Sequence, residues 1–261
     1  MQIKTAKRAV VQPKILLLDI ETAPSLGFYF DLWKEGNIVG TVKNWYILSF
    51  SYKWLGEKTV HAVALPDFQE YKKDKENDWS LCYFLQKKLD EADMVIAHNG
   101  DRFDLPKINA RFLKHGFKPP QPYKTVDTLK VARRYFKLDS NRLNDVAKYL
   151  GVGSKLSHTG FKLWDDCMKG DIRAWSLMKR YNKQDVVLLE KVYLALRPWM
   201  TNHPNFNVFT EQDGCPSCGS KNVQKRGYSI TQTGRKQRYQ CQEKVCGAWS
   251  HSTSEKVTDI R

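Results

Sequence analysis

Two acidic residues stand two positions apart at the end of an apolar segment near the start of the chain. Asp19 and Glu21 follow the run KILLL, and residues 14–20 have the continuous apolar character of a buried strand. Side chains two apart on a strand project from the same face, so both carboxylates should point the same way. Such a pair repels itself unless a cation lies between the two charges, and it therefore predicts a divalent metal site. The alternative is a strand end whose acids enter solvent.

A second acidic position follows a predicted turn. The segment 94–97 predicts a short strand, and the Asn-Gly pair after it predicts a turn that leads to Asp104. If the two strands are parallel neighbours, this turn lies at the same sheet edge as Asp19. Asp101 competes for the same role, but we expect Phe103 to act as an apolar anchor beside Asp104. Taken alone, this segment is only a turn followed by a helix start.

A third group combines a phenol with a carboxylate. Tyr181 and Asp185 stand at positions i and i+4 of a predicted long helix, which places them one turn apart on one face. A core tyrosine beside a solvated aspartate is the alternative for this pair. All three groups together are much harder to attribute to chance than any one of them.

Strands and helices that could position these acids alternate along the chain. The β-branched and aromatic segments 45–54 and 58–64 predict a hairpin, which must be antiparallel. The strand at 94–97 follows a helical crossover, so the sheet should be mixed and the fold class α/β. We expect a helix over about 78–91 with Asp78 as its N-cap, and another over 103–113. A further helix should begin after Asp127, which would be its N-cap. The last two should run over 143–150, ending before Gly151, and from Asp171 to Pro198.

The acidic motifs resemble those of a known family. Asp19-x-Glu21, Asn99-x-x-x-Phe103-Asp104 and Tyr181-x-x-x-Asp185 look like the three motifs of the DEDD-type 3′–5′ exonucleases, in the subclass with tyrosine in the third motif. The resemblance covers about residues 14 to 197. It implies a ribonuclease-H-like mixed β-sheet flanked by helices, in which four carboxylates hold two Mg²⁺ or Mn²⁺ ions.

The resemblance also implies a role for each residue. Asp19 would bridge the two ions, with Glu21 and Asp185 on one ion and Asp104 toward the other. Tyr181 is a poor base at neutral pH and would position the attacking water by hydrogen bonding. Asn99 stands at its motif position, where it would contact nucleic acid or serve only the turn.

Four of the six cysteines crowd near the C-terminus. Cys215-Pro-Ser-Cys218 and Cys241-x-x-x-x-Cys246 flank a segment that alternates like a hairpin. Four thiolates match one tetrahedral Zn²⁺, and so small a segment has too little core to fold without metal. This pattern predicts a structural zinc ribbon, although the second pair departs from the usual two-residue spacing. Free or disulfide-paired cysteines are the alternative.

The predicted ribbon is basic and aromatic. Its hairpin carries Arg235, Lys236, Arg238 and Tyr239, which suit phosphate contact combined with base stacking. A solvated basic hairpin or a protein-docking module would have the same composition, so the ribbon could also hold a protein partner.

Charge and hydropathy narrow the function class. The chain has 261 residues, and its 43 Lys and Arg against 28 Asp and Glu give a net charge of +15, which favours polyanionic partners. No window resembles a membrane span, and the basic N-terminal segment lacks the cleavage site of a signal peptide. We therefore expect no membrane partner and, by default, a cytoplasmic location.

These observations lead to one hypothesis and two competitors. We expect an exonuclease domain over 1–198, a linker over 199–213 and a zinc-ribbon domain over 214–261. The predicted activity is metal-dependent 3′–5′ hydrolysis of phosphodiester bonds at a single-stranded or 3′ end, with DNA slightly favoured over RNA. A structure-selective endonuclease on the same fold and a non-catalytic nucleic-acid-binding or adaptor protein are the competitors.

Overall fold

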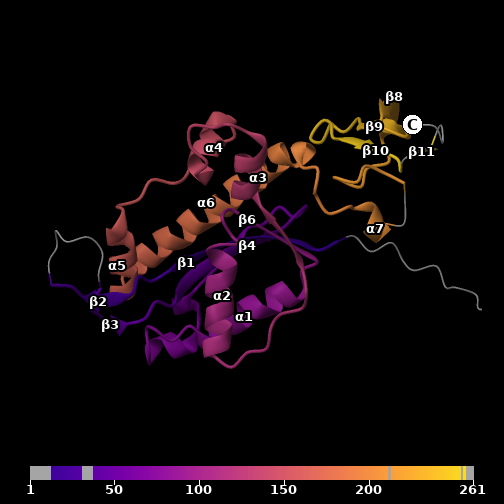
Figure 1. Cartoon of the computed structure of the whole chain (residues 1–261). Coiled ribbons are helices and arrows are strands. Elements are labelled where there is room, and N and C mark those ends of the chain that lie inside the picture. The colour runs from indigo at the N-terminus through magenta and orange to yellow at the C-terminus, as the bar shows by residue number, and fades with distance from the viewer. Residues whose placement is uncertain (1–12, 31–37, 211–212, 254, 257–261) are drawn as a thin grey trace, which may run out of the picture. The chain divides into compact units, whose positions relative to one another are not determined.

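The computed structural model describes residues 13–30, 38–210, 213–253 and 255–256 (Figure 1). The expectation about a signal peptide concerns the first 12 residues and lies outside the described ranges. Contacts divide the chain into two compact units. The larger unit comprises Lys14–Lys130 and Leu138–Val192, whereas Val131–Lys137 and Tyr193–Arg261 belong to the smaller one.

A mixed sheet forms the centre of the larger unit. Its strand order is β5-β4-β1-β6-β7, with β1 in the middle. Strand β1 pairs antiparallel with β4 and parallel with β6, and β4 pairs antiparallel with β5, so the predicted mixed sheet is confirmed. The strands are β1 (Ile15–Thr22), β4 (Ile47–Trp54), β5 (His61–Ala64), β6 (Met94–Ala97) and β7 (Lys124–Asp127).

Helices cover both faces of this sheet (Figure 1). Leu16, Leu18 and Ile20 of β1 pack in one core with residues of α1 and α2, while the opposite face carries Asp19 and Glu21 and is covered by α6. This alternation follows from the two-residue period of a strand. The helices that lie wholly in the larger unit are α1 (Trp79–Asp90), α2 (Asp104–Lys114), α4 (Leu143–Tyr149) and α5 (Phe161–Lys169). The boundary between the units falls within α3 (Thr128–Tyr135) and within α6 (Ile172–Leu196), most of which belongs to the larger unit.

Asp78 precedes α1 as expected, but its side chain does not cap the helix. Its carboxylate instead accepts hydrogen bonds from the Ile47 backbone N–H at 2.9 Å and from the buried Arg111 guanidinium, and it lies 2.6 Å from Nε2 of His115. A buried carboxylate needs charged partners more than one exposed helix end needs a cap, which explains the difference.

Three features of the larger unit are additions to the expected elements. The short strands β2 (Leu26–Phe28) and β3 (Gly40–Lys43) pair as a separate hairpin after β1. Helix α5 stands between Gly160 and Gly170 and supplies side chains to the region around Glu21. Two single-turn segments, η1 (Leu65–Asp67) and η2 (Gln69–Lys72), complete the path from β5 to α1.

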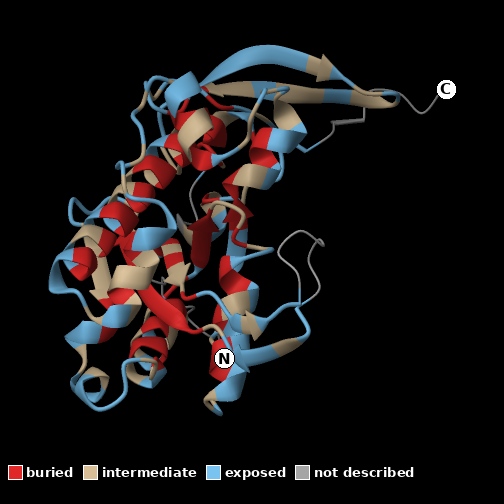
Figure 2. Cartoon of the chain, turned by 90° about the vertical axis from the view of Figure 1, so that its left-hand side faces the viewer, coloured by how far each residue is buried: buried red, intermediate tan, exposed pale blue. Residues whose placement is uncertain are grey.

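The smaller unit contains the cysteine segment. Strands β8 (Val223–Ile230) and β9 (Gly234–Cys241) form an antiparallel hairpin, and β10 (Trp249–His251) and β11 (Glu255–Lys256) also pair with β9. Figure 2 draws β8 and β9 mainly as intermediate and exposed, so this unit has a small core. Before it stand η3 (Arg197–Trp199) and α7 (Asn207–Thr210). Both lie near or in the expected linker over 199–213, whose boundaries remain a prediction.

Among the described helices, none is both long enough and apolar enough to cross a membrane.

Candidate functional site

Three carboxylates from two distant segments meet on one face of the sheet. Asp19 and Glu21 project from the end of β1, and Asp185 projects from α6. Each offers an oxygen, and the three oxygens lie within 4.8 Å of one another. The fold therefore brings together three of the four acids that the sequence predicted to share a site.

Small side chains on β4 make room for this arrangement. Asp19 pairs in register with Ser51, and Glu21 pairs with Ser49. Both serines are fully buried, and their small size leaves space for α6 to approach the sheet. From α6, Asn182 donates through Nδ2 to Asp19 Oδ2 at 2.5 Å. This bond orients one oxygen of the Asp19 carboxylate and leaves the other for a further ligand.

The fourth acid, Asp104, begins α2 and lies against β1. Its Oδ1 accepts a hydrogen bond from the backbone N–H of Ile20 at 3.1 Å, so it is adjacent to Asp19 without belonging to the close trio. The competing residue Asp101 instead pairs with Lys130 at 2.6 Å. Phe103, expected as an apolar anchor beside Asp104, is 39% exposed. The bond to the Ile20 N–H holds the carboxyl group in place.

Asn99 forms the turn between β6 and α2. Its φ of 67° lies in the left-handed region, which asparagine tolerates better than most residues. Its carbonyl oxygen accepts from Arg102 and Phe103, and its N–H donates to Asp127 at 2.9 Å. Asp127 also accepts from Leu129 at the start of α3, which agrees with its predicted capping role. A contact of Asn99 with nucleic acid remains a prediction.

Lys155 is a site residue that the sequence did not reveal. Its Nζ lies 2.5 Å from Asp185 Oδ2 and donates to the Tyr181 hydroxyl at 3.1 Å. Tyr181 stands one helical turn from Asp185, and its hydroxyl favours the charged form of that carboxylate by lowering its pKa. Lys155 lies in an irregular segment after α4, and no motif or periodicity links it to α6.

Two aromatic side chains beside the acids also escaped sequence reasoning. Trp164 on α5 lies close enough to Glu21 to lower the pKa of its carboxyl, and the ring of His158 packs edge-on against Tyr181 with centroids 4.7 Å apart. The spacing of Leu163 and Cys167, both buried, was the available signal for α5.

Burial and mutual repulsion disfavour the charged forms of the acids. Burial, with the Glu21 and Asp185 charges, raises the pKa of Asp19 well above its usual range. Burial and the Asp185 carboxylate raise the pKa of Glu21 to about 8. Burial also raises the pKa of Asp104 to about 7, and the pKa of Asp185 lies above its ordinary value for the same reason. The side chains of the site therefore do not supply enough positive charge to balance four ionised carboxylates.

A divalent cation fits this donor set. Asp185 Oδ1 is buried and has no hydrogen-bond partner within the described part of the chain. A buried oxygen without a partner is costly, and hard carboxylate oxygens are the ligands that Mg²⁺ and Mn²⁺ prefer. Asp19, Glu21 and Asp185 together could hold such an ion, with Asp104 beside them.

The raised pKa values predict how the stability of the ion-free protein depends on pH. The ordinary pKa of Glu21 is 4.5, and its folded-state pKa is about 8. Between these values the folded chain binds more protons than the unfolded chain, so the free energy of unfolding should fall as pH rises. Urea unfolding in EDTA at several pH values measures this slope. Glu21→Gln should flatten it, and a wild-type stability that increases across the same interval would contradict the prediction.

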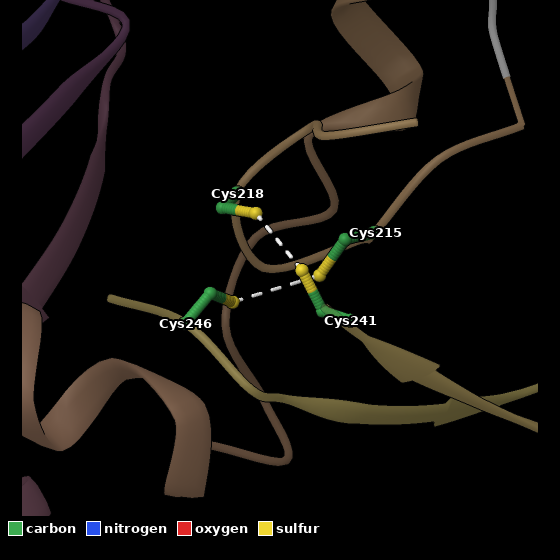
Figure 3. A group of neighbouring side chains, drawn as sticks. All are labelled: Cys215, Cys218, Cys241 and Cys246. Atoms are coloured by element: carbon green, nitrogen blue, oxygen red, sulfur yellow. Dashed lines mark hydrogen bonds between the residues drawn. The ribbon is translucent and has the colours of Figure 1, made fainter. Parts of the chain in front are cut away.

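The four clustered cysteines converge in the smaller unit (Figure 3). Sγ of Cys215 lies 3.8 Å from that of Cys246, and Sγ of Cys218 lies 3.7 Å from that of Cys241. These separations are too long for disulfides. Four sulfurs each about 2.3 Å from a central zinc in tetrahedral geometry would be about 3.8 Å apart. The cluster thus has the dimensions of a Cys₄ zinc site despite the four-residue spacing of its second pair.

The residues predicted to bind nucleic acid fall on two faces of the β8–β9 hairpin. Strand alternation puts Arg235 and Tyr239 on one face of β9 and Lys236 and Arg238 on the other. On the first face, the Arg235 guanidinium lies 4.4 Å from the centre of the Tyr228 ring. The four residues therefore do not form one continuous surface, and each face has its own basic side chains.

Comparison with protein families agrees with the architecture. Residues 39–197, more than half of the chain, match the family model described as RNase_H superfamily. The chain belongs to the RNase_H superfamily. The match includes Asp104, Tyr181 and Asp185 and begins after β1, which nevertheless forms the central strand of the same sheet.

Membership of this superfamily defines the class of protein. Its fold is that of nucleic-acid-processing nucleases, which act on phosphodiesters and usually use divalent metals. A nucleic-acid substrate follows from this membership. No curated protein matches the sequence.

Proposed function

We propose that the chain is a metal-dependent 3′–5′ exonuclease of the DEDD type with tyrosine in its third motif. The observation that carries this proposal is the meeting of Asp19, Glu21 and Asp185, with Asp104 adjacent, within a domain of the RNase_H superfamily. A binding protein with no catalytic role would have no need to hold so many repelling carboxylates in one buried place.

The acids would divide the ligand positions among them. Asp19 lies close to both Glu21 and Asp185 and to Asp104, which suits a ligand shared by two ions. Glu21 and Asp185 would complete one position and Asp104 the other. Two Mg²⁺ or Mn²⁺ ions bound there would stabilise the charge that develops on the attacking and leaving oxygens of the phosphodiester.

Tyr181 would orient the attacking water. Burial and the neighbouring Asp185 raise the pKa of its phenol to about 12, so it is protonated at neutral pH and cannot act as a base. Its hydroxyl accepts a hydrogen bond from Lys155 and stands one helical turn from Asp185, so it has the fixed position that a hydrogen-bonding guide requires.

A cavity beside the acids suits the last nucleotide of a strand. It has a volume of about 430 Å³, and its lining includes Thr22, the residue that follows Glu21 in the chain. Trp45, Phe161 and Trp164 contribute aromatic walls on which a base can stack, and Lys107 adds a positive charge. An unpaired terminal nucleotide fits such a cavity better than a base pair, which favours a single-stranded end.

The cysteine cluster would hold one structural Zn²⁺ and fold a ribbon that contacts the substrate strand or a protein partner. The basic side chains on both faces of the β8–β9 hairpin support contact with phosphates. We retain the proposed boundaries, with the exonuclease domain over 1–198 and the ribbon over 214–261.

A cleavage time course tests the proposed activity. The full chain is incubated with 5′-labelled single strands of DNA or RNA in Mg²⁺, Mn²⁺ or EDTA, and a circular single strand of each serves as a matched substrate without an end. The expected result is a metal-dependent ladder that shortens from the 3′ end, with the circular strands left intact.

The other outcomes have definite meanings. Cleavage of the circular strand, or discrete internal products, would replace the exonuclease with an endonuclease that uses the same acids. Binding without cleavage of any substrate in either metal would contradict enzymatic activity and favour the binding module. The comparison of the two linear strands identifies the preferred nucleic acid.

A further inference from the structure

Lys155 places a positive charge where the acidic site would bind a metal ion. Its Nζ is 2.5 Å from Asp185 Oδ2, and its side chain remains 32% exposed although Asp185 is almost completely buried. The ammonium thus reaches the acids from the solvent side and contacts the same carboxylate whose other oxygen, Oδ1, has no partner in the described part of the chain and could bind a divalent ion.

The charge of Lys155 acts on the whole acidic group. It lowers the pKa of Asp19, Glu21, Asp104 and Asp185, opposing the effect of their burial. Although burial lowers the pKa of the Lys155 ammonium, the Asp185 carboxylate raises it above its ordinary value, so the lysine is charged at neutral pH. In the ion-free protein it therefore supplies part of the charge compensation that a divalent ion would provide.

The backbone around Lys155 is held firmly, whereas its side chain has room to move. The Lys155 N–H donates to Asn144 Oδ1 at 2.8 Å, and Gln184 donates to the neighbouring carbonyl of Ser154 at 3.0 Å. These bonds fix the start of the side chain between α4 and α6. Four flexible methylene groups then allow the ammonium to change partners without a movement of the loop.

We propose that Lys155 is an exchangeable counter-ion, which neutralises Asp185 in the ion-free protein and transfers to a phosphate oxygen of the substrate when a divalent ion takes its place. This inference rests on the proposed function of the acidic site. It assigns to Lys155 a role in coupling two binding events rather than in the chemical step.

Coupling follows from the repulsion between the ammonium and a divalent ion bound to the same carboxylate. A divalent ion alone must displace the ammonium, which then lies beside the ion without an anionic partner. A phosphate supplies that partner, so phosphate and ion should each strengthen the binding of the other by the same factor. Ion binding would then be strongest where a substrate strand is already present.

Titration with Mn²⁺ tests this proposal without measuring catalysis. The full chain, isolated with its zinc, is titrated above the pKa of about 8 of Glu21, so that protons compete weakly for the acids. Thymidine 5′-monophosphate serves as an uncleavable source of phosphate, and thymidine serves as its phosphate-free control. Free Mn²⁺ is followed by electron paramagnetic resonance.

Lys155→Met removes the charge and keeps the length of the side chain. It should bind Mn²⁺ about tenfold more tightly than the wild type in the absence of nucleotide, as expected for loss of an opposing charge in contact with a carboxylate. The nucleotide should strengthen Mn²⁺ binding in the wild type and not in this variant. Lys155→Arg should behave nearly as the wild type, and Lys169→Met, at an exposed surface pair, should have no effect.

Two outcomes would overturn the inference. One is Mn²⁺ binding by Lys155→Met that is no tighter than binding by the wild type. The other is a nucleotide that strengthens Mn²⁺ binding in Lys155→Met as much as it does in the wild type. Asp19→Ala, titrated in parallel, separates this failure from failure of the proposed function. If Asp19→Ala binds Mn²⁺ as well as the wild type, the acids do not form the metal site; if only Lys155→Met is unaltered, the lysine inference alone is wrong.

Discussion

Replacement of Asp19 by alanine should lower the rate of phosphodiester hydrolysis by roughly 10³-fold or more, while the affinity for nucleic acid changes little. Asp19 is the acid with the most acidic neighbours, and its loss removes the ligand shared by both proposed ion positions. Stabilisation of the reacting phosphate by metal ions contributes several kcal/mol, which corresponds to a change of this size. Single-turnover cleavage and fluorescence anisotropy in EDTA measure the two quantities separately.

Asp101→Ala is the matched control for this experiment. Asp101 lies three residues before Asp104 in the same turn, but its carboxylate pairs with Lys130 outside the acidic group. Its removal should leave the cleavage rate within about twofold of the wild type, as for most surface changes. Retention of cleavage by Asp19→Ala would contradict the mechanism, and equal losses in both variants would show that disturbance of the fold was being measured.

Unfolding should not account for the effect of Asp19→Ala. In the ion-free protein the charged form of Asp19 is disfavoured by burial and by the charges of Glu21 and Asp185. Removing it relieves repulsion, which offsets the loss of its hydrogen bond from Asn182. Thermal unfolding in EDTA should therefore give a melting temperature close to that of the wild type.

Cys215→Ser should release the zinc and unfold the ribbon, which is the largest structural effect that we expect from one substitution. Cys215, Cys241 and Cys246 are themselves most of the buried core of this region, together with Ala248. Zinc binding in such small domains contributes on the order of 10 kcal/mol to folding, and no comparable apolar core exists to replace it. Zinc content by mass spectrometry and limited proteolysis after residue 213 measure the loss.

Cys82→Ser and Cys167→Ser provide the controls for this substitution. Both cysteines are buried in the core of the larger unit and stand apart from the cluster. They should retain one zinc per chain and the protease resistance of the ribbon. A Cys215→Ser protein that still held one zinc and resisted proteolysis would contradict the proposed role of the cluster.

The main strands and helices could be predicted because their signals are local. The apolar run before Asp19 has the character of a buried strand, and β1 is the central strand. The turn at Asn99 follows from the rare backbone conformation that asparagine accepts. The acids could be predicted because their spacing reflects strand and helix periods, which are properties of adjacent residues.

Long-range partners had no comparable signal. Lys155 contacts Asp185 across 30 residues of chain, from a segment without regular structure. Phe103 was expected as an apolar anchor beside Asp104, yet it is partly exposed beneath the Lys107 ammonium, which lies 5.2 Å from its ring centre. Asp78 is diverted from its helix by the buried Arg111. In each case a distant side chain outweighed a local preference.

The bond between Asn182 and Asp19 spans 163 residues of sequence. During synthesis β1 therefore leaves the ribosome long before α6. Its two acids, Asp19 and Glu21, are present before Asn182 and Asp185 have been synthesised. Nascent chains that end before α6 lack Asn182 and Asp185 and hold only part of the acidic group. If the chain is the proposed nuclease, its metal site is complete only after almost the whole of residues 14–197 has been translated.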